Sequence, residues 1–197
     1  ISVYITSFEN ENASITINSS SRNAIPIASA VTDDFWSTLH SGGGEWMWKS
    51  FQFEEPDEPA VDWIVQAMIN NTSLWVTDGS HYSQRGPDIS AAAWIVMDTR
   101  TGRKMSCSFV EFSPDASSYR AEALGLYSIH AFIQALYNHF HMGQASAEIC
   151  CDNETALKEA QGRRKRVSAG RTSADVFRGI RKMTQEIQQL KWKYTWV

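Results

Sequence analysis

The sequence lacks a hydrophobic run long enough to cross a membrane, and it lacks the start of a secretory signal. None of its 197 residues fall in a stretch of about 18 consecutive apolar residues, the length that a membrane-spanning helix needs. Residues 1–5 also lack the positive charge that opens a signal peptide. We therefore expect an intracellular protein, of the cytoplasm or the nucleus, with no membrane partner.

Cysteine is scarce as well. The three cysteines are Cys107, Cys150 and Cys151, and the last two are neighbours on a predicted strand. Neighbouring side chains on a strand point to opposite faces, and no histidine stands at a spacing typical of zinc sites. This pattern speaks against a disulfide framework and predicts small core residues in a reducing compartment.

Basic residues are almost missing from the first part of the chain and abundant in the last. Residues 1–70 carry ten acidic and two basic side chains, a balance of -8. Residues 158–197 carry eleven basic and three acidic side chains, a balance of +8, although the whole chain has a net charge of -4. The basic end is where a polyanion such as nucleic acid would be held. The predicted contacts to nucleic acid are Arg163, Arg164, Lys165, Arg166 and Arg171.

The second part of the chain has the pattern of an α/β fold. The predicted elements are strands at 74–78, 90–97 and 104–112, a helix at 118–141, a strand at 147–151, a short helix ending at 160, a helix at 173–190 and a strand from 192. The hairpin connection at 98–102 makes the first three strands antiparallel. Because a helix joins the fourth strand to the others, we expect it to run parallel to the first.

Three carboxylates stand where these elements would bring them together. Asp78 ends the first strand, and Asp152 follows the fourth. Glu122 lies one heptad before Ile129 on the apolar stripe of the long helix, so it faces the sheet, where an unpaired charge is costly. Such a group of oxygen ligands suits Mg²⁺ or Mn²⁺. Two of these ions together can activate a water and stabilise the leaving oxygen of a phosphodiester.

A second interpretation of the acidic residues is a pair of carboxylates acting as acid and base on a glycosidic bond. That chemistry needs two carboxylates, so it leaves the third one and the basic end of the chain unexplained. Phosphodiester chemistry accounts for both, and it is the interpretation that we favour.

The order of these motifs resembles the type 1 ribonuclease H domain, especially the version attached to retroelement reverse transcriptases. The matching motifs are Thr-Asp-Gly-Ser at 77–80, Ser-Tyr-Arg-Ala-Glu-Ala-Leu-Gly-Leu at 118–126 and Cys-Asp-Asn at 151–153. The resemblance covers residues 73–197 and implies a ribonuclease H-like fold, in which helices flank a five-stranded mixed sheet. It also implies cleavage of the RNA strand of RNA–DNA hybrids.

The resemblance further implies roles for individual residues and partners. Asp78, Glu122 and Asp152 would be the catalytic residues and the ligands of two Mg²⁺ or Mn²⁺ ions. Residues 1–72 would be an N-terminal extension that connects the domain to a reverse transcriptase region in the same polypeptide.

One departure from the family pattern bears on activity. The family has a fourth acid, usually with a histidine nearby, just after the fifth strand, and this chain ends at Val197 within that strand. The domain at 73–197 is therefore expected to be incomplete at its C-terminal end. Asp175 is an acid late in the chain, but it lies at the start of a core helix, where we interpret it as a helix N-terminal charge.

Three functional interpretations follow from these observations. The favoured one is a metal-dependent ribonuclease H domain of a retroelement polyprotein. The second is a catalytically inactive module of the same fold that binds nucleic acid or serves as a scaffold. The third is another polynucleotidyl transferase of this fold, since a fold alone does not fix a function.

The basic run gives a testable prediction. Replacing Arg163, Arg164, Lys165 and Arg166 by alanine should weaken hybrid binding and flatten its salt dependence, because each lost phosphate contact removes about 0.9 from the slope of log K against log salt. Hybrid affinities measured at several salt concentrations give this slope, and an unchanged slope would make the run a solvated turn. The preference for RNA should survive, because it is read through the 2′-hydroxyl.

Overall fold

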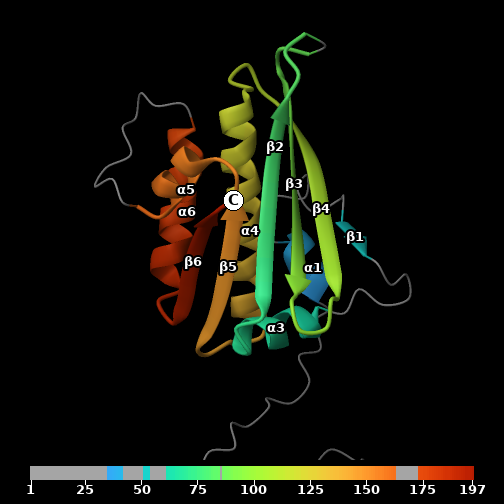
Figure 1. Cartoon of the computed structure of the whole chain (residues 1–197), viewed down its shortest axis with the longest axis vertical. Coiled ribbons are helices and arrows are strands. Elements are labelled where there is room, and N and C mark those ends of the chain that lie inside the picture. The colour runs from blue at the N-terminus through green and yellow to red at the C-terminus, as the bar shows by residue number, and fades with distance from the viewer. Residues whose placement is uncertain (1–34, 42–50, 54–60, 85, 163–172) are drawn as a thin grey trace, which may run out of the picture. The chain divides into compact units, whose positions relative to one another are not determined.

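A six-stranded sheet forms the centre of the fold (Figure 1). The computed structural model describes residues 35–41, 51–53, 61–84, 86–162 and 173–197. The strands are β1 (Phe51–Phe53), β2 (Ser73–His81), β3 (Ile89–Asp98), β4 (Lys104–Phe112), β5 (Ala145–Cys151) and β6 (Leu190–Trp196). The helices are α1 (Phe35–Ser41), α3 (Asp62–Ile69), α4 (Ser118–His139), α5 (Glu154–Ala160) and α6 (Ala174–Glu186). None of these helices is long and apolar enough to cross a membrane.

The sheet has the mixed pairing that the sequence predicts. Its strand order is β1-β4-β3-β2-β5-β6. The pairs β2–β3 and β3–β4 are antiparallel, whereas β5 is parallel to β2 and β6 is parallel to β5. The turn between β3 and β4 closes at Gly102, which has a φ of 78°, and the Asp98 carboxylate accepts hydrogen bonds from Arg100 and Thr101. The predicted five strands are confirmed, and β1 adds a sixth at the β4 edge.

Strand β2 and helix α6 end elsewhere than predicted. Strand β2 continues past Asp78 to His81, because its antiparallel partner β3 continues to pair with it there. Helix α6 ends at Glu186 rather than at residue 190, because Ile187 leaves the helical region with φ -107° and ψ 68°. Ile187 and Leu190 are buried all the same, so the apolar spacing carries on into the turn and the first residue of β6.

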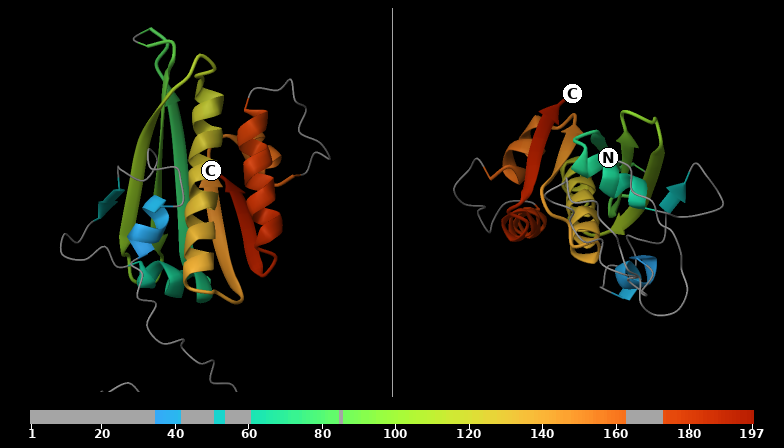
Figure 2. Two further views of the ribbon diagram at one scale, coloured as in Figure 1. Left: turned by 180° about the vertical axis from the view of Figure 1, so that it is seen from behind. Right: turned by 90° about the horizontal axis from the view of Figure 1, so that it is seen from below.

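Helices α4 and α6 lie across the same face of the sheet (Figure 2). On that face the rings of Trp75 and Trp94 lie 5.7 Å apart, and the Phe132 ring of α4 lies 5.3 Å from Trp94. All three side chains are almost fully buried. Burial of side chains this large, each contributing on the order of 2–3 kcal/mol, fixes α4 against β2 and β3.

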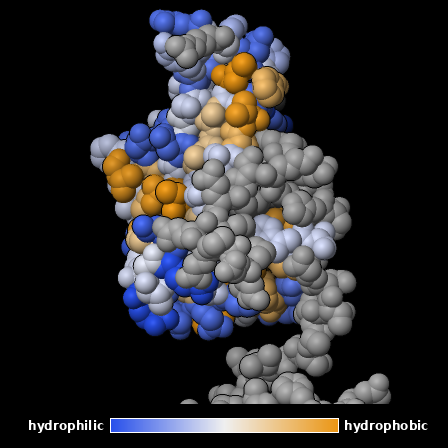
Figure 3. Space-filling model, turned by 90° about the vertical axis from the view of Figure 1, so that its right-hand side faces the viewer, coloured by the Kyte–Doolittle hydropathy of each residue, from blue (hydrophilic) through white to orange (hydrophobic). Residues whose placement is uncertain are grey.

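Apolar side chains also remain at the surface, interspersed with polar ones (Figure 3). The exposed large ones among the described residues are Ile69, Val76, Tyr82, Ile89, Ile95, Val110, Phe112, Trp196 and Val197. Val76 and Ile95 are paired across β2 and β3 and alternate with buried residues, so they lie on the face away from α4.

Part of the predicted N-terminal extension shares the core of this domain. Residues 33–197 form one compact unit, so the boundary predicted between residues 72 and 73 falls inside it. Phe35 of α1 lies 5.6 Å from Phe132, ring to ring, and Ile64 and Met68 of α3 are fully buried. The role of residues 1–72 as a connecting segment stays a prediction.

The contact between α4 and β2 depends on two glycines. A Cβ at Gly79 would collide with the backbone nitrogen of Glu122 and lie 2.5 Å from the carbonyl carbon of Ala121. A Cβ at Gly125 would collide with the hydroxyl of Thr77. The helix and the strand therefore approach more closely than two side-chain-bearing residues permit.

Alanine at Gly79 should lower the free energy of unfolding by about 1–3 kcal/mol, because the backbone of α4 would have to move away from β2. Gly143→Ala is the matched control, since Gly143 is exposed and a Cβ there meets nothing within 4 Å. It should change stability by no more than about 1 kcal/mol. Chemical denaturation of both variants checks this, and equal effects would contradict the close approach.

Candidate active site

The end of the parallel pairing between β2 and β5 positions two of the predicted acids. The last parallel pair is Thr77 with Cys151, so Asp78 and Asp152 are the next residues on adjacent strands. Asp152 precedes Asn153, whose side chain accepts a hydrogen bond of 3.0 Å from the backbone of Ala156 and caps α5, as the sequence predicts. Both acids therefore lie just past the end of the parallel pairing, Asp78 within β2 and Asp152 directly after β5.

The third predicted acid, Glu122, enters from the first turns of α4. Ser117 caps this helix by accepting a hydrogen bond of 3.1 Å from the backbone of Arg120. Glu122 then falls on the buried face, and its side chain is only 5% exposed. Its carboxylate accepts hydrogen bonds from the backbone of Gly79 and from the thiol of Cys151, with 3.5 Å between sulfur and oxygen.

The structure brings two of the three predicted acids into one cluster with a residue that the prediction treated as core. Glu122, Cys151 and Asp152 each offer one ligand atom, and these atoms lie within 4.8 Å of one another. Asp78 is not in this cluster, although its charge acts on Glu122. Alternation along β5 places Cys151 on the same face as Thr77, toward α4, but it does not distinguish a ligand from a core residue.

Burial dominates the electrostatics of the cluster. It raises the pKa of Glu122 to about 7; the hydrogen bond from Cys151 opposes the rise, and the negative charges of Asp152 and Asp78 add to it. Burial also raises the pKa of the Cys151 thiol to about 12. Glu122 has no ion-pair partner in the described part of the chain. A bound cation would lower the cost of ionising Glu122.

The donor chemistry fits a divalent metal ion. The carboxylates of Glu122 and Asp152 are hard oxygen ligands of the kind that Mg²⁺ and Mn²⁺ prefer, whereas Asp78, which follows the last parallel pair on β2, is not in the cluster. The sulfur of Cys151 is not a ligand for Mg²⁺. The oxygen atoms of this cluster therefore suit the predicted ions, and its sulfur atom does not.

Asp175 has a different role from the clustered acids. It lies in the first turn of α6, as predicted, and its carboxylate pairs with Arg120 at 3.2 Å. Arg120 also binds Glu111 of β4 at 2.8 Å. The guanidinium thus ties α4 to β4 and α6, and it holds the pKa of Asp175 below its ordinary value despite partial burial.

The predicted contacts to nucleic acid lie outside the described residues. They are Arg163, Arg164, Lys165, Arg166 and Arg171. Their role stays a prediction, and the experiment on the salt dependence of hybrid binding is its test.

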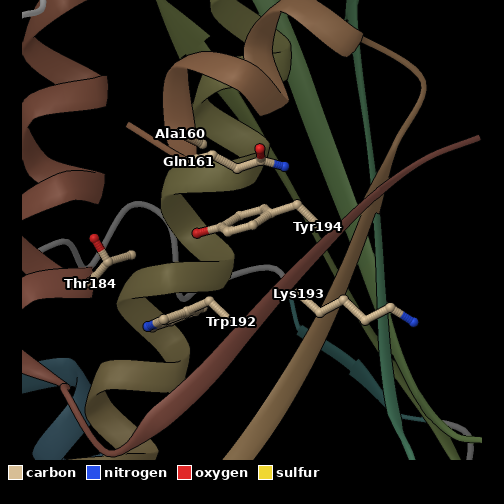
Figure 4. A pocket seen from close by; sticks show the side chains of 6 residues that line it. All are labelled: Ala160, Gln161, Thr184, Trp192, Lys193 and Tyr194. Atoms are coloured by element: carbon tan, nitrogen blue, oxygen red, sulfur yellow. The ribbon is translucent and has the colours of Figure 1, made fainter. Parts of the chain in front are cut away.

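A separate cavity of about 490 Å³ lies between α5, α6 and β6 (Figure 4). Its lining residues are Ala160, Gln161, Thr184, Trp192, Lys193 and Tyr194. The Tyr194 hydroxyl donates to Nε2 of the buried His130 at 2.8 Å, and Nδ1 of His130 donates to the carbonyl of Leu126 at 2.7 Å. Burial lowers the pKa of His130 to about 4. The imidazole is therefore neutral at pH 7 and serves as a packing element behind Trp192 and Tyr194.

The raised pKa of Glu122 predicts how the metal-free protein responds to pH. Between its ordinary value of 4.5 and about 7 the folded state keeps the proton that the unfolded state loses, so stability falls as pH rises through this range. Each tenfold difference in proton affinity corresponds to about 1.4 kcal/mol. Glu122→Gln should therefore stabilise the protein at pH 8, by on the order of 1–3 kcal/mol, and leave it little changed at pH 4.

Denaturation of both proteins in the presence of a chelator checks this prediction. The difference between wild type and Glu122→Gln isolates the carboxylate, because the opposite contribution of His130 is common to both proteins. A difference that does not change between pH 4 and pH 8 would contradict the burial of an unpaired charge at Glu122.

Comparisons with known proteins gave matches among solved structures alone. No family model and no curated protein matches this chain. Among solved structures, the N-terminal RNase H domain of a Mycobacterium tuberculosis protein has a TM-score of 0.45 and 13% identity, over 63% of this chain and 81% of that chain. RNase H1 of Halobacterium salinarum has a TM-score of 0.44 and 16% identity, over 64% and 84%.

A third similar structure is the protease-reverse transcriptase of prototype foamy virus, with a TM-score of 0.47 and 9% identity. The match covers 63% of this chain and 17% of the viral one. The fold of this chain is defined by its own sheet, in which β4, β3 and β2 are antiparallel neighbours and β5 and β6 continue parallel to β2. This strand order and pairing, with helices α4 and α6 on one face, is a ribonuclease H-like fold.

Proposed function

We propose that this chain is a metal-dependent ribonuclease H domain that hydrolyses the RNA strand of RNA–DNA hybrids. The observation that carries the proposal is the cluster at the carboxyl end of β2 and β5. There Glu122, buried and without a cation among the described residues, offers an oxygen within 4.8 Å of a ligand atom of Asp152. A buried carboxylate this close to a second acid is costly to ionise unless a cation neutralises it.

Asp78, Glu122 and Asp152 would hold Mg²⁺ or Mn²⁺. When bound, two such ions supply an activated water and stabilise the leaving oxygen of a phosphodiester. The chain contributes the orientation of the ligands. The backbone of Gly79 and the thiol of Cys151 hold the Glu122 carboxylate in place by hydrogen bonds.

The position of Asp152 is fixed from the neighbouring strand. The indole nitrogen of Trp196 donates to the backbone carbonyl of Asp152 at 2.9 Å, and the backbone nitrogen of Val197 donates to the carbonyl of Cys151 at 3.3 Å. Strand β6 thus anchors the backbone of Asp152, while the Asp152 side chain stays exposed to solvent. An exposed carboxylate beside a buried one suits a substrate that approaches from outside the sheet.

The substrate and the context belong to the same proposal. The basic run at 163–166 with Arg171 would contact the phosphates of the hybrid, and the 2′-hydroxyls would distinguish RNA from DNA. The motif resemblance supports a retroelement polyprotein in which a reverse transcriptase region is the covalent partner.

A catalytically inactive module that binds nucleic acid or serves as a scaffold is the second candidate. One observation favours it: the cluster of three ligand atoms contains Cys151 in place of Asp78. A site that lacks one carboxylate ligand would hold one of its two ions weakly. Binding of the hybrid would then survive while cleavage is lost.

The activity test uses a labelled RNA–DNA hybrid with Mg²⁺ or Mn²⁺ under single-turnover conditions. We expect slow cleavage of the RNA strand that a chelator abolishes. Asp78→Asn, Glu122→Gln and Asp152→Asn should each lower the rate by at least about 100-fold, more than the loss of a residue that merely orients a ligand costs.

Asp175→Asn is the matched control, because it makes the same change in an acid that pairs with Arg120 and lies outside the cluster. It should retain most of the rate. Equal cleavage by Asp78→Asn would remove the catalytic assignment, and hybrid binding without any cleavage would favour the inactive module.

A further inference from the structure

We propose that Glu122, Cys151 and Asp152 form a mixed sulfur and oxygen site that binds Zn²⁺ or a similar thiophilic divalent ion, with the Cys151 sulfur as a direct ligand. The inference rests on the same cluster as the proposed function and names an ion class that the acidic motifs alone do not suggest. It requires metal binding only, and hydrolysis does not enter into it.

The separation of the ligand atoms is the first support. Zinc bonds of about 2.3 Å to sulfur and about 2.1 Å to oxygen, at a tetrahedral angle, place the two ligand atoms about 3.6 Å apart. The Cys151 sulfur and Oε2 of Glu122 lie 3.5 Å apart. A ligand atom of Asp152 lies within 4.8 Å of both. The Cys151 sulfur and the Glu122 oxygen are thus spaced as two ligands of a four-coordinate ion, Asp152 is near enough to supply a third, and a water or another small ligand would complete the set.

The orientation of the sulfur is the second support. Cys151 is fully buried on the face toward α4, whereas its neighbour Cys150 points to the opposite face and is not in the cluster. The backbone nitrogen of Asn153 donates to the Cys151 sulfur at 3.4 Å, so the sulfur already acts as an acceptor. The thiol proton is directed to Oε2 of Glu122, so its loss on metal binding would leave a sulfur lone pair facing that carboxylate.

The chemistry of the donors then selects the ion. Mg²⁺ takes oxygen ligands, whereas thiolate ligands select softer ions such as Zn²⁺. On binding, the Cys151 thiol releases its proton to solvent and the sulfur forms a bond to the ion. The ion also neutralises the carboxylate of Glu122, which has no ion-pair partner among the described residues. A thiophilic ion would therefore occupy the carboxylates that Mg²⁺ needs.

Cobalt titration of the whole chain tests this inference, because Co²⁺ replaces Zn²⁺ in such sites and gives a near-ultraviolet charge-transfer band when a thiolate binds it. We expect one equivalent of Co²⁺ to produce the band, Zn²⁺ to remove it, and an excess of Mg²⁺ to leave it. Cys151→Ser should abolish the band. Cys150→Ser, the same change at the adjacent residue on the other face, should retain it.

Glu122→Gln separates a defect of the site from a defect of folding, since it keeps every cysteine. It should weaken Co²⁺ binding by at least about 10-fold, with an unchanged circular dichroism spectrum. Absence of the band in wild type, its survival in Cys151→Ser or an unchanged affinity in Glu122→Gln would each overturn the inference. Because the titration does not measure cleavage, an inactive protein that shows the band disproves the proposed function alone, and an active protein without the band disproves this inference alone.

Discussion

The contact on which the site depends is the close approach of α4 to β2. Gly79 and Gly125 remove the side chains that would otherwise separate the two backbones, and the large rings packed around Phe132 hold the helix in that position. The same contact brings Glu122 to the strand end and lets the backbone of Gly79 hydrogen-bond its carboxylate. The packing of α4 on β2 and the position of the Glu122 carboxylate therefore depend on the same contact. A change in one changes the other.

The local patterns were sufficient for most of the fold. Alternating apolar residues predicted β3 and β4 closely, because each strand is buried on one face only. The helical stripe predicted that Glu122 is buried, since the stripe continues through the residue. The sequence pattern did not predict the ends of elements that depend on tertiary pairing. Strand β3 sets the end of β2, and the apolar spacing at residues 187–190 belongs to a turn and a strand.

The pattern of apolar residues also predicted part of the candidate site. Strand order places Asp152 and the apolar stripe of the helix places Glu122, and ligand atoms of these two residues lie within 4.8 Å, whereas Asp78 is not in the cluster. The sequence predicts Cys151 to be a core residue, because nothing in the sequence distinguishes a buried cysteine that packs from one that binds a metal ion. Only the approach of α4 reveals that its sulfur faces a carboxylate, and this is a property of the three-dimensional arrangement.

The hydrogen bond from the Trp196 indole to the carbonyl of Asp152 connects the candidate site to β6, a strand at the edge of the sheet. Among the described strands β6 pairs with β5 alone, and strands at the edge of a sheet open more readily than central ones. Each opening of β6 would release the backbone of Asp152 while Asp78 and Glu122 stay in place on central elements. The fraction of molecules with a complete site would then depend on how often β6 opens. A bound ion or hybrid would stabilise the state in which β6 is paired.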